Sequence, residues 1–338
     1  MKAAVFNDTG ELTVVERNLP DPKPGWVRLA ITAVGICGSD LNLLYGHHGS
    51  SRGVQPGHEV AGVIDVVGDG VQHLAVGTPV ALEPLVGCGT CRYCRTGLHN
   101  LCPEVRLCGF TRPGGMAEFL TVPADALYAL PPTLPSHIAA LSEPMAVCVR
   151  GARLARLAPG ERVAILGAGS IGLLSILAAR AAGASEIVIT ARHPHQQALA
   201  HALGADAVFD SATSLLAAVG PQHVDVVIET VGGRADTLAE SVRIARNGGR
   251  IVLLGVFDGE PTLPGFALFQ KELTIRASNC YGRECHQPDF GLATELVARH
   301  RDRLEPLVTH RFKLDQVAQA FAAAADKSTH SIKVQIEP

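Results

Sequence analysis

Four of the nine cysteines in this chain are crowded into residues 88–102, which points to metal binding. The spacing C-x2-C-x2-C-x7-C is formed by Cys88, Cys91, Cys94 and Cys102. Thiolates at this spacing can surround one tetrahedral ion and leave no position open, so we expect a structural zinc lobe over residues 86–104. Iron–sulfur ligation uses related spacings, and four unligated thiols in a loop are a further alternative. Ordinary buried thiols are expected at Cys108, Cys148, Cys280 and Cys285.

Three shorter motifs also carry side chains that could bind a metal. Cys37 opens the run Cys-Gly-Ser-Asp, His58 and Glu59 follow a glycine, and Glu143 precedes a proline. Taken singly, a lone histidine or glutamate is more often a surface or hydrogen-bonded residue than a ligand. Each motif therefore needs support from the rest of the chain.

A glycine-rich turn indicates a dinucleotide site. Residues 167–172 read GAGSIG, directly after the apolar run 163–166 and before an Ala/Leu-rich segment. In the pattern G-x-G-x-x-G, the first glycine allows a tight turn, the second lets a pyrophosphate approach, and the third lets helix pack on strand. The helix start offers free N–H groups to the phosphates. The alternative is a turn that binds nothing. The expected cofactor contacts are Gly167, Gly169, Ser170, Ile171 and Gly172.

The end of the next expected strand bears on which cofactor is used. A site for NAD places an acidic residue about 20 residues after the glycine turn, where it binds the ribose hydroxyls. Residues 190–193 read Thr-Ala-Arg-His, with no acid. Arg192 could instead face the additional phosphate of NADP, so we expect NADP to be preferred over NAD. The alternative is an arginine on a solvated loop.

The pattern of the chain changes near residue 145. Before it, short β-rich runs between turn signals predict a barrel or sandwich. After it, apolar strands alternate with helices, which predicts a parallel sheet covered on both faces. The expected strands of that sheet are 163–166, 186–190, 207–209, 224–229, 250–255 and 273–277. The segments expected to rejoin the first domain are a helix at 289–300, a strand at 306–312, a helix at 314–324 and a strand at 331–337.

Length and charge exclude several classes of protein. A chain of 338 residues suggests two domains. A net charge of −3, with no run of like charges, argues against a nucleic-acid groove or a membrane-surface stripe. The sequence contains no unbroken apolar stretch of the ~18 residues that a membrane span needs. Because residues 1–20 lack an apolar signal core, we expect a cytoplasmic protein.

Taken in order, these motifs closely resemble the zinc-dependent medium-chain dehydrogenase/reductase family. The resemblance covers nearly the whole chain, and it is greatest for the branch of polyol and threonine dehydrogenases that includes the sorbitol and butanediol enzymes. It implies a chaperonin-like β-barrel catalytic domain in two segments, residues 1–145 and 279–338. A Rossmann doubly wound parallel sheet, residues 146–278, is inserted between them. It also implies a homodimer or homotetramer.

The same resemblance implies roles for individual residues. Cys37 and His58 would be ligands of a second, catalytic zinc ion, with Glu59 as a third or exchangeable ligand. Glu143 would ligate directly or through the zinc-bound water. Asp40 would hold the ring of His58. Ser39 would pass on the proton of the substrate hydroxyl. A thiolate, an imidazole and a carboxylate leave a fourth position for a substrate oxygen, which the ion polarises as a Lewis acid.

The sequence departs from the family pattern near Cys37. Many relatives have a histidine of the proton relay where this chain has Asn42, and the nearby His47 or His48, or solvent, could replace it. Sorbitol-type relatives have a tyrosine at Leu43, which weakens a sorbitol assignment. Arg276 and Tyr281 stand at positions where polyol dehydrogenases have residues of the substrate pocket.

We therefore expect an NAD(P)-linked enzyme with two zinc ions. It would transfer hydride between the nicotinamide ring and a secondary alcohol, such as a polyol, diol, cyclitol or amino-alcohol, or the corresponding ketone. One alternative is L-threonine 3-dehydrogenase. The other is a non-catalytic relative that binds the nucleotide only.

Overall fold

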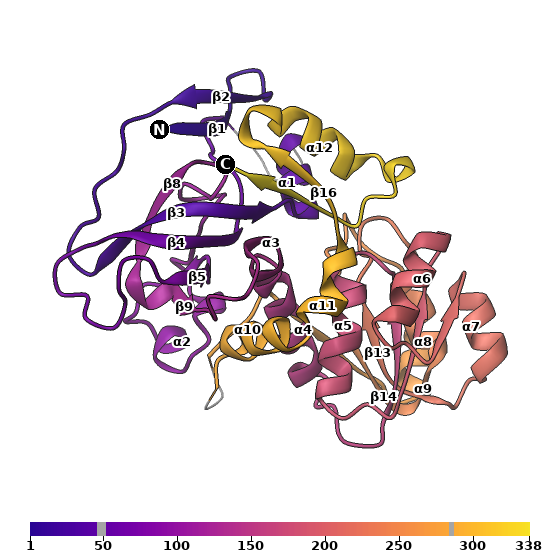
Figure 1. The fold of residues 1–338 in the computed structure, drawn as a ribbon. Helices are drawn as coiled ribbons and strands as arrows, with labels where there is room; N and C mark the ends of the chain where they lie inside the picture. The colour runs from indigo at the N-terminus through magenta and orange to yellow at the C-terminus, as the bar shows by residue number, and fades with distance from the viewer. Residues whose placement is uncertain (46–51, 284–286) are drawn as a thin grey trace. The chain divides into compact units, whose positions relative to one another are not determined.

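The computed structural model describes residues 1–45, 52–283 and 287–338. The chain divides into two compact units (Figure 1). The first consists of Met1–Glu143 together with Gly282–Pro338, and the second of Pro144–Tyr281. Each unit is described by itself below. Among the described residues, no helix combines the length and the apolar character needed to span a membrane.

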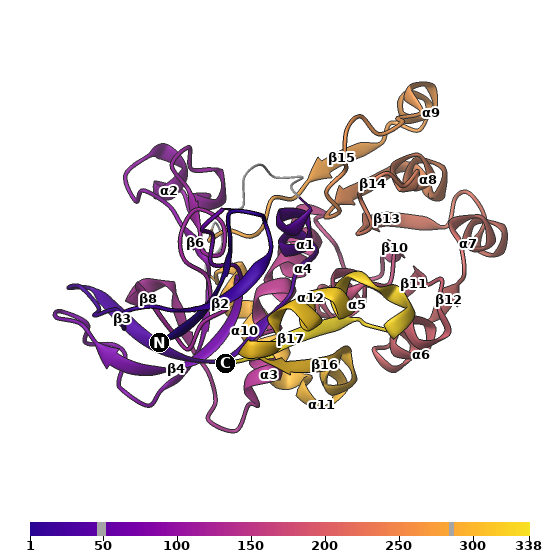
Figure 2. The ribbon, with the colours of Figure 1, turned by 90° about the horizontal axis from the view of Figure 1, so that it is seen from above.

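The second unit is built on a six-stranded parallel sheet. Its strands are β10 (Arg162–Leu166), β11 (Glu186–Thr190), β12 (Ala207–Phe209), β13 (Val224–Glu229), β14 (Ala245–Leu253) and β15 (Thr274–Ala277). Their order is β12-β11-β10-β13-β14-β15, and Figure 2 shows the last three side by side. Numbered within the unit, this is the Rossmann order 3-2-1-4-5-6. Successive strands are added on one side of β10 up to β12 and on its other side from β13 onward. The expected parallel sheet is confirmed.

Helices connect these strands and cover the sheet. They are α5 (Ser170–Ala181), α6 (Pro194–Ala202), α7 (Ala212–Val219), α8 (Thr237–Ile244) and α9 (Gly265–Gln270). The helix α4 (Ser142–Leu154) lies at the changeover between the units. Because crossovers between parallel strands are right-handed, α5 and α6 belong on one face and α7 to α9 on the other. In agreement, α5 contacts α6, and α8 contacts both α7 and α9.

The first unit is β-rich and largely antiparallel. Its seven-stranded sheet has the order β16-β17-β3-β4-β5-β9, and β8 also pairs with β3. The strands are β3 (Trp26–Gly35), β4 (Glu59–Val67), β5 (Pro79–Leu82), β8 (Phe119–Pro123), β9 (Leu127–Ala129), β16 (Val308–Lys313) and β17 (Lys333–Glu337). Two-stranded sheets are formed by β1 (Lys2–Phe6) with β2 (Leu12–Glu16) and by β6 (Leu85–Val86) with β7 (Arg106–Leu107).

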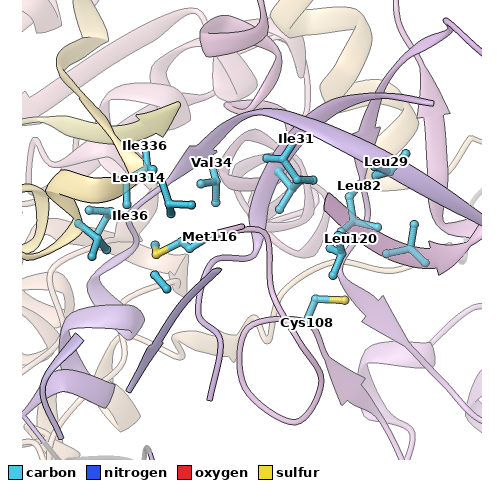
Figure 3. Close-up of a cluster of buried hydrophobic side chains, with 14 of the residues drawn as sticks. Leu29, Ile31, Val34, Ile36, Leu82, Cys108, Met116, Leu120, Leu314 and Ile336 are labelled. Carbon is cyan, nitrogen blue, oxygen red and sulfur yellow. The ribbon is translucent and has the colours of Figure 1, made fainter. Parts of the chain in front are cut away.

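The two segments of the first unit share one core. Side chains from β3, β5, β8 and β17 meet in it, among them Leu29, Leu82, Leu120 and Ile336 (Figure 3). The rings of Phe6, near the start of the chain, and Phe321 form a T-shaped contact at a centroid distance of 6.4 Å. Burial of this apolar surface explains why the C-terminal segment returns to the first unit.

Short helices complete the first unit. The α-helices are α1 (Gly38–Leu44), α2 (Arg92–Arg95), α3 (Ser136–Ala139), α10 (Asp289–Arg299), α11 (Arg301–Leu304) and α12 (Val317–Ala325). The 3-10 turns are η1 (His99–Leu101), η2 (Ala124–Ala126), η3 (Glu305–Leu307), η4 (Leu314–Gln316) and η5 (Lys327–Thr329).

Candidate active site

Cys37, His58 and Glu59 come together at one end of the β3–β4 pair. Cys37 follows β3 and caps α1, while Glu59 is the first residue of β4 and lies opposite Gly35. Ligand atoms of the three residues lie within 4.8 Å of one another. His58 and Glu59 are buried, and Cys37 is partly buried. A sulfur, a nitrogen and an oxygen donor at this separation fit a zinc ion with one position left for another ligand.

Glu59 also forms an ion pair that the sequence did not suggest. Lys333 of β17 places Nζ 2.6 Å from Oε1 and 2.8 Å from Oε2 of Glu59, and it donates to the carbonyl of Ile36 at 3.2 Å. Burial by itself would lower the pKa of Lys333, but the carboxylate of Glu59 and the thiol of Cys37 outweigh it and raise this pKa above its ordinary value. The ammonium group therefore remains charged. The only signal in the sequence is a lysine within a buried C-terminal strand.

Asp40 connects Cys37 with His58. Its Oδ2 accepts a hydrogen bond of 2.9 Å from the backbone N–H of Cys37, and its Oδ1 lies 3.6 Å from Nδ1 of His58. That oxygen and that nitrogen are buried and have no hydrogen-bond partner in the described part of the chain. Burial lowers the pKa of His58, but the Asp40 carboxylate more than compensates and raises it well above the usual value. Asp40 is therefore placed to orient the ring of His58 through Nδ1, as the partner of a metal-binding histidine does.

The other residues proposed for this site lie at different depths. Ser39 is partly buried in α1, beside Asp40. Glu143 is buried in the first turn of α4, outside the three-residue group, although its charge contributes to the raised pKa of Lys333. Asn42 is partly buried and Leu43 fully so. His47 and His48 lie outside the described residues.

The four clustered cysteines form a second group whose sulfur atoms lie within 4.8 Å of one another. Backbone N–H groups of Cys88, Cys91 and Cys94 each donate to a sulfur of the group at 3.4 Å. The hydroxyl of Thr90 and nearby backbone N–H groups lower the pKa of Cys88 to about 6, whereas burial raises the pKa of Cys94 to about 12. The fit to zinc therefore rests on geometry: four sulfur donors this close together suit a closed tetrahedral site.

The remaining cysteines agree only partly with expectation. Cys108 and Cys148 are buried, as expected. Cys280 is only partly buried, so the expectation of a buried thiol is wrong at this position. The reason is its place shortly after β15, an edge strand whose last residues are exposed. Cys285 lies outside the described residues.

A buried carboxylate connects the cysteine lobe to the second segment of the first unit. Glu83 lies 2.7 Å from Nε2 of His99, and it accepts hydrogen bonds from Arg283 at 2.5 Å and from the hydroxyl of Tyr128 at 3.0 Å. Burial raises the pKa of Glu83, but His99 and Arg283 outweigh this and lower it below its ordinary value. Since Arg283 also donates its backbone N–H to Gly97 at 2.6 Å, the lobe is fixed from both sides.

The glycine turn lies where β10 ends and α5 begins. Gly167 has a φ of 98°, which favours glycine. A Cβ at Gly172 would collide with the carbonyl oxygen of Gly167, whereas one at Gly169 would meet no atom within 4 Å. Packing therefore explains the third glycine but not the second, whose open surroundings fit a pyrophosphate. Ser170 and Ile171 form the first turn of α5, which offers N–H groups to an anion.

Arg192 is exposed just beyond β11. No acidic residue occupies positions 190–193. Arg276 is exposed on β15, and it lines a cavity of about 230 Å³ together with Arg156 and Arg250. Tyr281 is fully buried.

Comparisons with known proteins agree along the whole chain. Residues 23–132 match the alcohol dehydrogenase GroES-like domain, and residues 170–299 match the zinc-binding dehydrogenase domain. A 2-dehydro-3-deoxy-L-galactonate 5-dehydrogenase of Pseudoalteromonas atlantica is 32% identical, over 100% of this chain and 98% of that protein. A sorbitol dehydrogenase of Arabidopsis thaliana is 34% identical, over 94% of this chain and 89% of that protein. A crystal structure of a zinc-binding dehydrogenase from Sinorhizobium meliloti 1021, bound to NADP, is 33% identical with a TM-score of 0.91, covering 100% and 99% of the two chains.

Proposed function

Because this chain belongs to the zinc-dependent medium-chain dehydrogenase/reductase family and is a zinc-type alcohol dehydrogenase, we propose that Cys37, His58 and Glu59 hold the zinc ion at which a secondary alcohol is oxidised. The observation that carries this proposal is the convergence of their three donor atoms within 4.8 Å. When bound, zinc supplies Lewis-acid chemistry and the nicotinamide accepts the hydride.

The protein residues have distinct tasks in this proposal. Asp40 orients Cys37 through its backbone N–H and keeps a carboxylate beside His58. Lys333 neutralises Glu59, so that this carboxylate can approach or leave the metal without becoming a buried charge that has no partner. The Ser39 hydroxyl would relay the proton of the substrate hydroxyl, accepting it and giving up its own proton toward solvent, while the nicotinamide would supply the hydride acceptor, so that the product is a ketone. Glu143 contributes negative charge nearby.

We further propose two zinc ions for each chain and NADP as the preferred cofactor. The cysteine group supports the second ion. The exposed Arg192, the absence of an acid at 190–193 and the NADP-bound relative support NADP. If so, Arg192→Ala should raise the KM for NADP about tenfold or more and leave that for NAD nearly unchanged, since a charged hydrogen bond to phosphate is lost. Equal use of both cofactors by the wild type and the variant would contradict the NADP proposal.

The natural substrate is proposed to be a small secondary alcohol or the corresponding ketone. The two relatives described above are named for different compounds, one a sugar acid and one a neutral polyol. A panel of sorbitol, 2,3-butanediol, cyclitols, L-threonine and sugar acids, assayed with both cofactors on zinc-loaded protein, tests the proposal. Two zinc ions per chain and turnover of at least one alcohol are expected. Cys37→Ser should abolish turnover and lose one zinc ion, and Cys108→Ser is the matched control.

We also propose a homodimer or homotetramer in the cytoplasm. β15 is an edge strand of the parallel sheet, and Phe266 and Phe269 of the neighbouring α9 are 78% and 81% exposed. An open edge next to exposed aromatic rings suits pairing with another copy. Light scattering of the wild type and of Phe269→Glu tests this, with a smaller assembly expected for the variant. No disulfide links the cysteines in the described part of the chain, which suits a reducing compartment.

A further inference from the structure

Three arginines surround one cavity of the first unit that the mechanism above does not use. The cavity has a volume of about 210 Å³ and is lined in part by Arg17, Arg52 and Arg112. None of the described residues that line it is acidic. For a chain whose net charge is −3, this is a local concentration of positive charge. A concave surface lined by one sign of charge attracts the opposite one.

One side chain that lines the cavity also contacts a candidate zinc ligand. Phe110 lines it, and the ring of Phe110 packs against the ring of His58 at a centroid distance of 5.7 Å. The same stretch of chain is held against the residues before His58, because Gly114 and Gly115 donate their backbone N–H groups to Gln55 and Gly57 at 2.8 Å. A ligand in the cavity would therefore lie one side chain, that of Phe110, away from His58.

Two of the arginines are held in place by neighbouring side chains. Gln55 is 2% exposed; its Nε2 donates to the carbonyl of Gly114 at 2.5 Å, and its Oε1 accepts from Arg17 at 3.4 Å. The guanidinium of Arg112 stacks on the ring of Trp26 at 4.5 Å from its centroid. Stacking and a neutral partner orient a guanidinium without cancelling its charge, which leaves it able to bind a planar or tetrahedral oxyanion.

We propose that this cavity binds an anionic group of the substrate, a carboxylate or a phosphate, so that the preferred substrate is a secondary alcohol that carries such a group. The inference rests on the proposed function, because it assumes that the alcohol reacts at the group of Cys37, His58 and Glu59. It decides between neutral and anionic alcohols, which the family assignment does not.

Matched substrates test the proposal. Galactitol, galactitol 1-phosphate and galactonate are assayed with the wild type, Arg17→Gln and Arg112→Gln, and Arg301→Gln of α11 is the control for loss of an exposed arginine. We expect at least one charged substrate to exceed galactitol by about tenfold or more in kcat/KM, because charged hydrogen bonds are the strong ones. Preference for the phosphate or for the galactonate identifies the group bound. Arg112→Gln should reduce that preference by about tenfold to a hundredfold, mainly through the KM for the charged substrate, whereas Arg301→Gln should leave it unchanged.

A binding measurement separates this inference from the proposed function. With the dinucleotide site filled by saturating NADP, inorganic phosphate should raise the melting temperature of the zinc-loaded wild type and the control, but not that of the Arg17→Gln/Arg112→Gln double variant. An enzyme that oxidises neutral alcohols as well as charged ones, or whose preference survives Arg112→Gln, would overturn the inference and leave the proposed function intact. Protein with two zinc ions that oxidises no alcohol overturns the proposed function, and the phosphate measurement then decides whether the anion site exists.

Discussion

Lys333 offers the sharpest test of how the candidate zinc site is built. Lys333→Met keeps an unbranched apolar stem but removes the ammonium that pairs with Glu59, where the two side chains are 4% and 1% exposed. Removing one partner of a buried ion pair costs about 3–5 kcal/mol, because the other charge is left without compensation in a low-dielectric interior. A metal ion at Glu59 would replace part of that compensation. We therefore expect Lys333→Met to lower the free energy of unfolding by the full amount in metal-free protein and by less in zinc-loaded protein.

The assay is urea unfolding followed by circular dichroism, with bound zinc measured on the same samples. Lys313 provides the control, since its contact with Glu337 is long at 3.5 Å and its side chain is 71% exposed. Lys313→Met should cost less than about 1 kcal/mol. The double variant Lys333→Met/Glu59→Gln should regain much of the lost stability, because no buried charge remains. If Lys333→Met were no more destabilising than Lys313→Met in either metal state, the buried ion pair would not have the role assigned to it.

Three further predictions concern other parts of the molecule. The pKa of Glu83 is lowered in the folded protein, so the stability that its charge contributes is present above its unfolded pKa of about 4.5 and is lost as the pH falls through the lower folded value. Glu83→Gln should therefore lower the melting temperature at pH 7 and make that temperature fall less steeply in acid. Parallel acid profiles for the wild type and the variant would argue against this. Gly169→Ala should raise the KM for the cofactor with little change in stability, whereas Gly172→Ala should lower the melting temperature because its Cβ meets backbone; equal effects in both assays would count against the glycine assignments. Cys102→Ser should lose one zinc ion per chain and destabilise the protein, as measured by metal analysis and thermal unfolding, while Cys108→Ser should keep all its zinc.

The sequence alone determined the features that depend on local spacing. The glycine turn follows from the tight bend and close packing between β10 and α5, which only a short run of glycines permits. The cysteine group follows from residues close along the chain, whose backbone carries the sulfurs to one point. The alternation of apolar strands and helices predicted the parallel sheet of the second unit.

Tertiary structure decided the contacts between residues far apart in the chain. Lys333 is 274 residues from Glu59, and Arg283 is 200 residues from Glu83, so no periodicity relates them. Arg17 and Arg112 share a cavity only because the chain near β2 and the loop after β7 fold against the same stretch, around Gln55. Patterns of period 2 or 3.6 report which face of an element is buried, but not which distant charge will meet it there. Pairing of buried charges depends on the assembled sheet, and only the folded chain shows it.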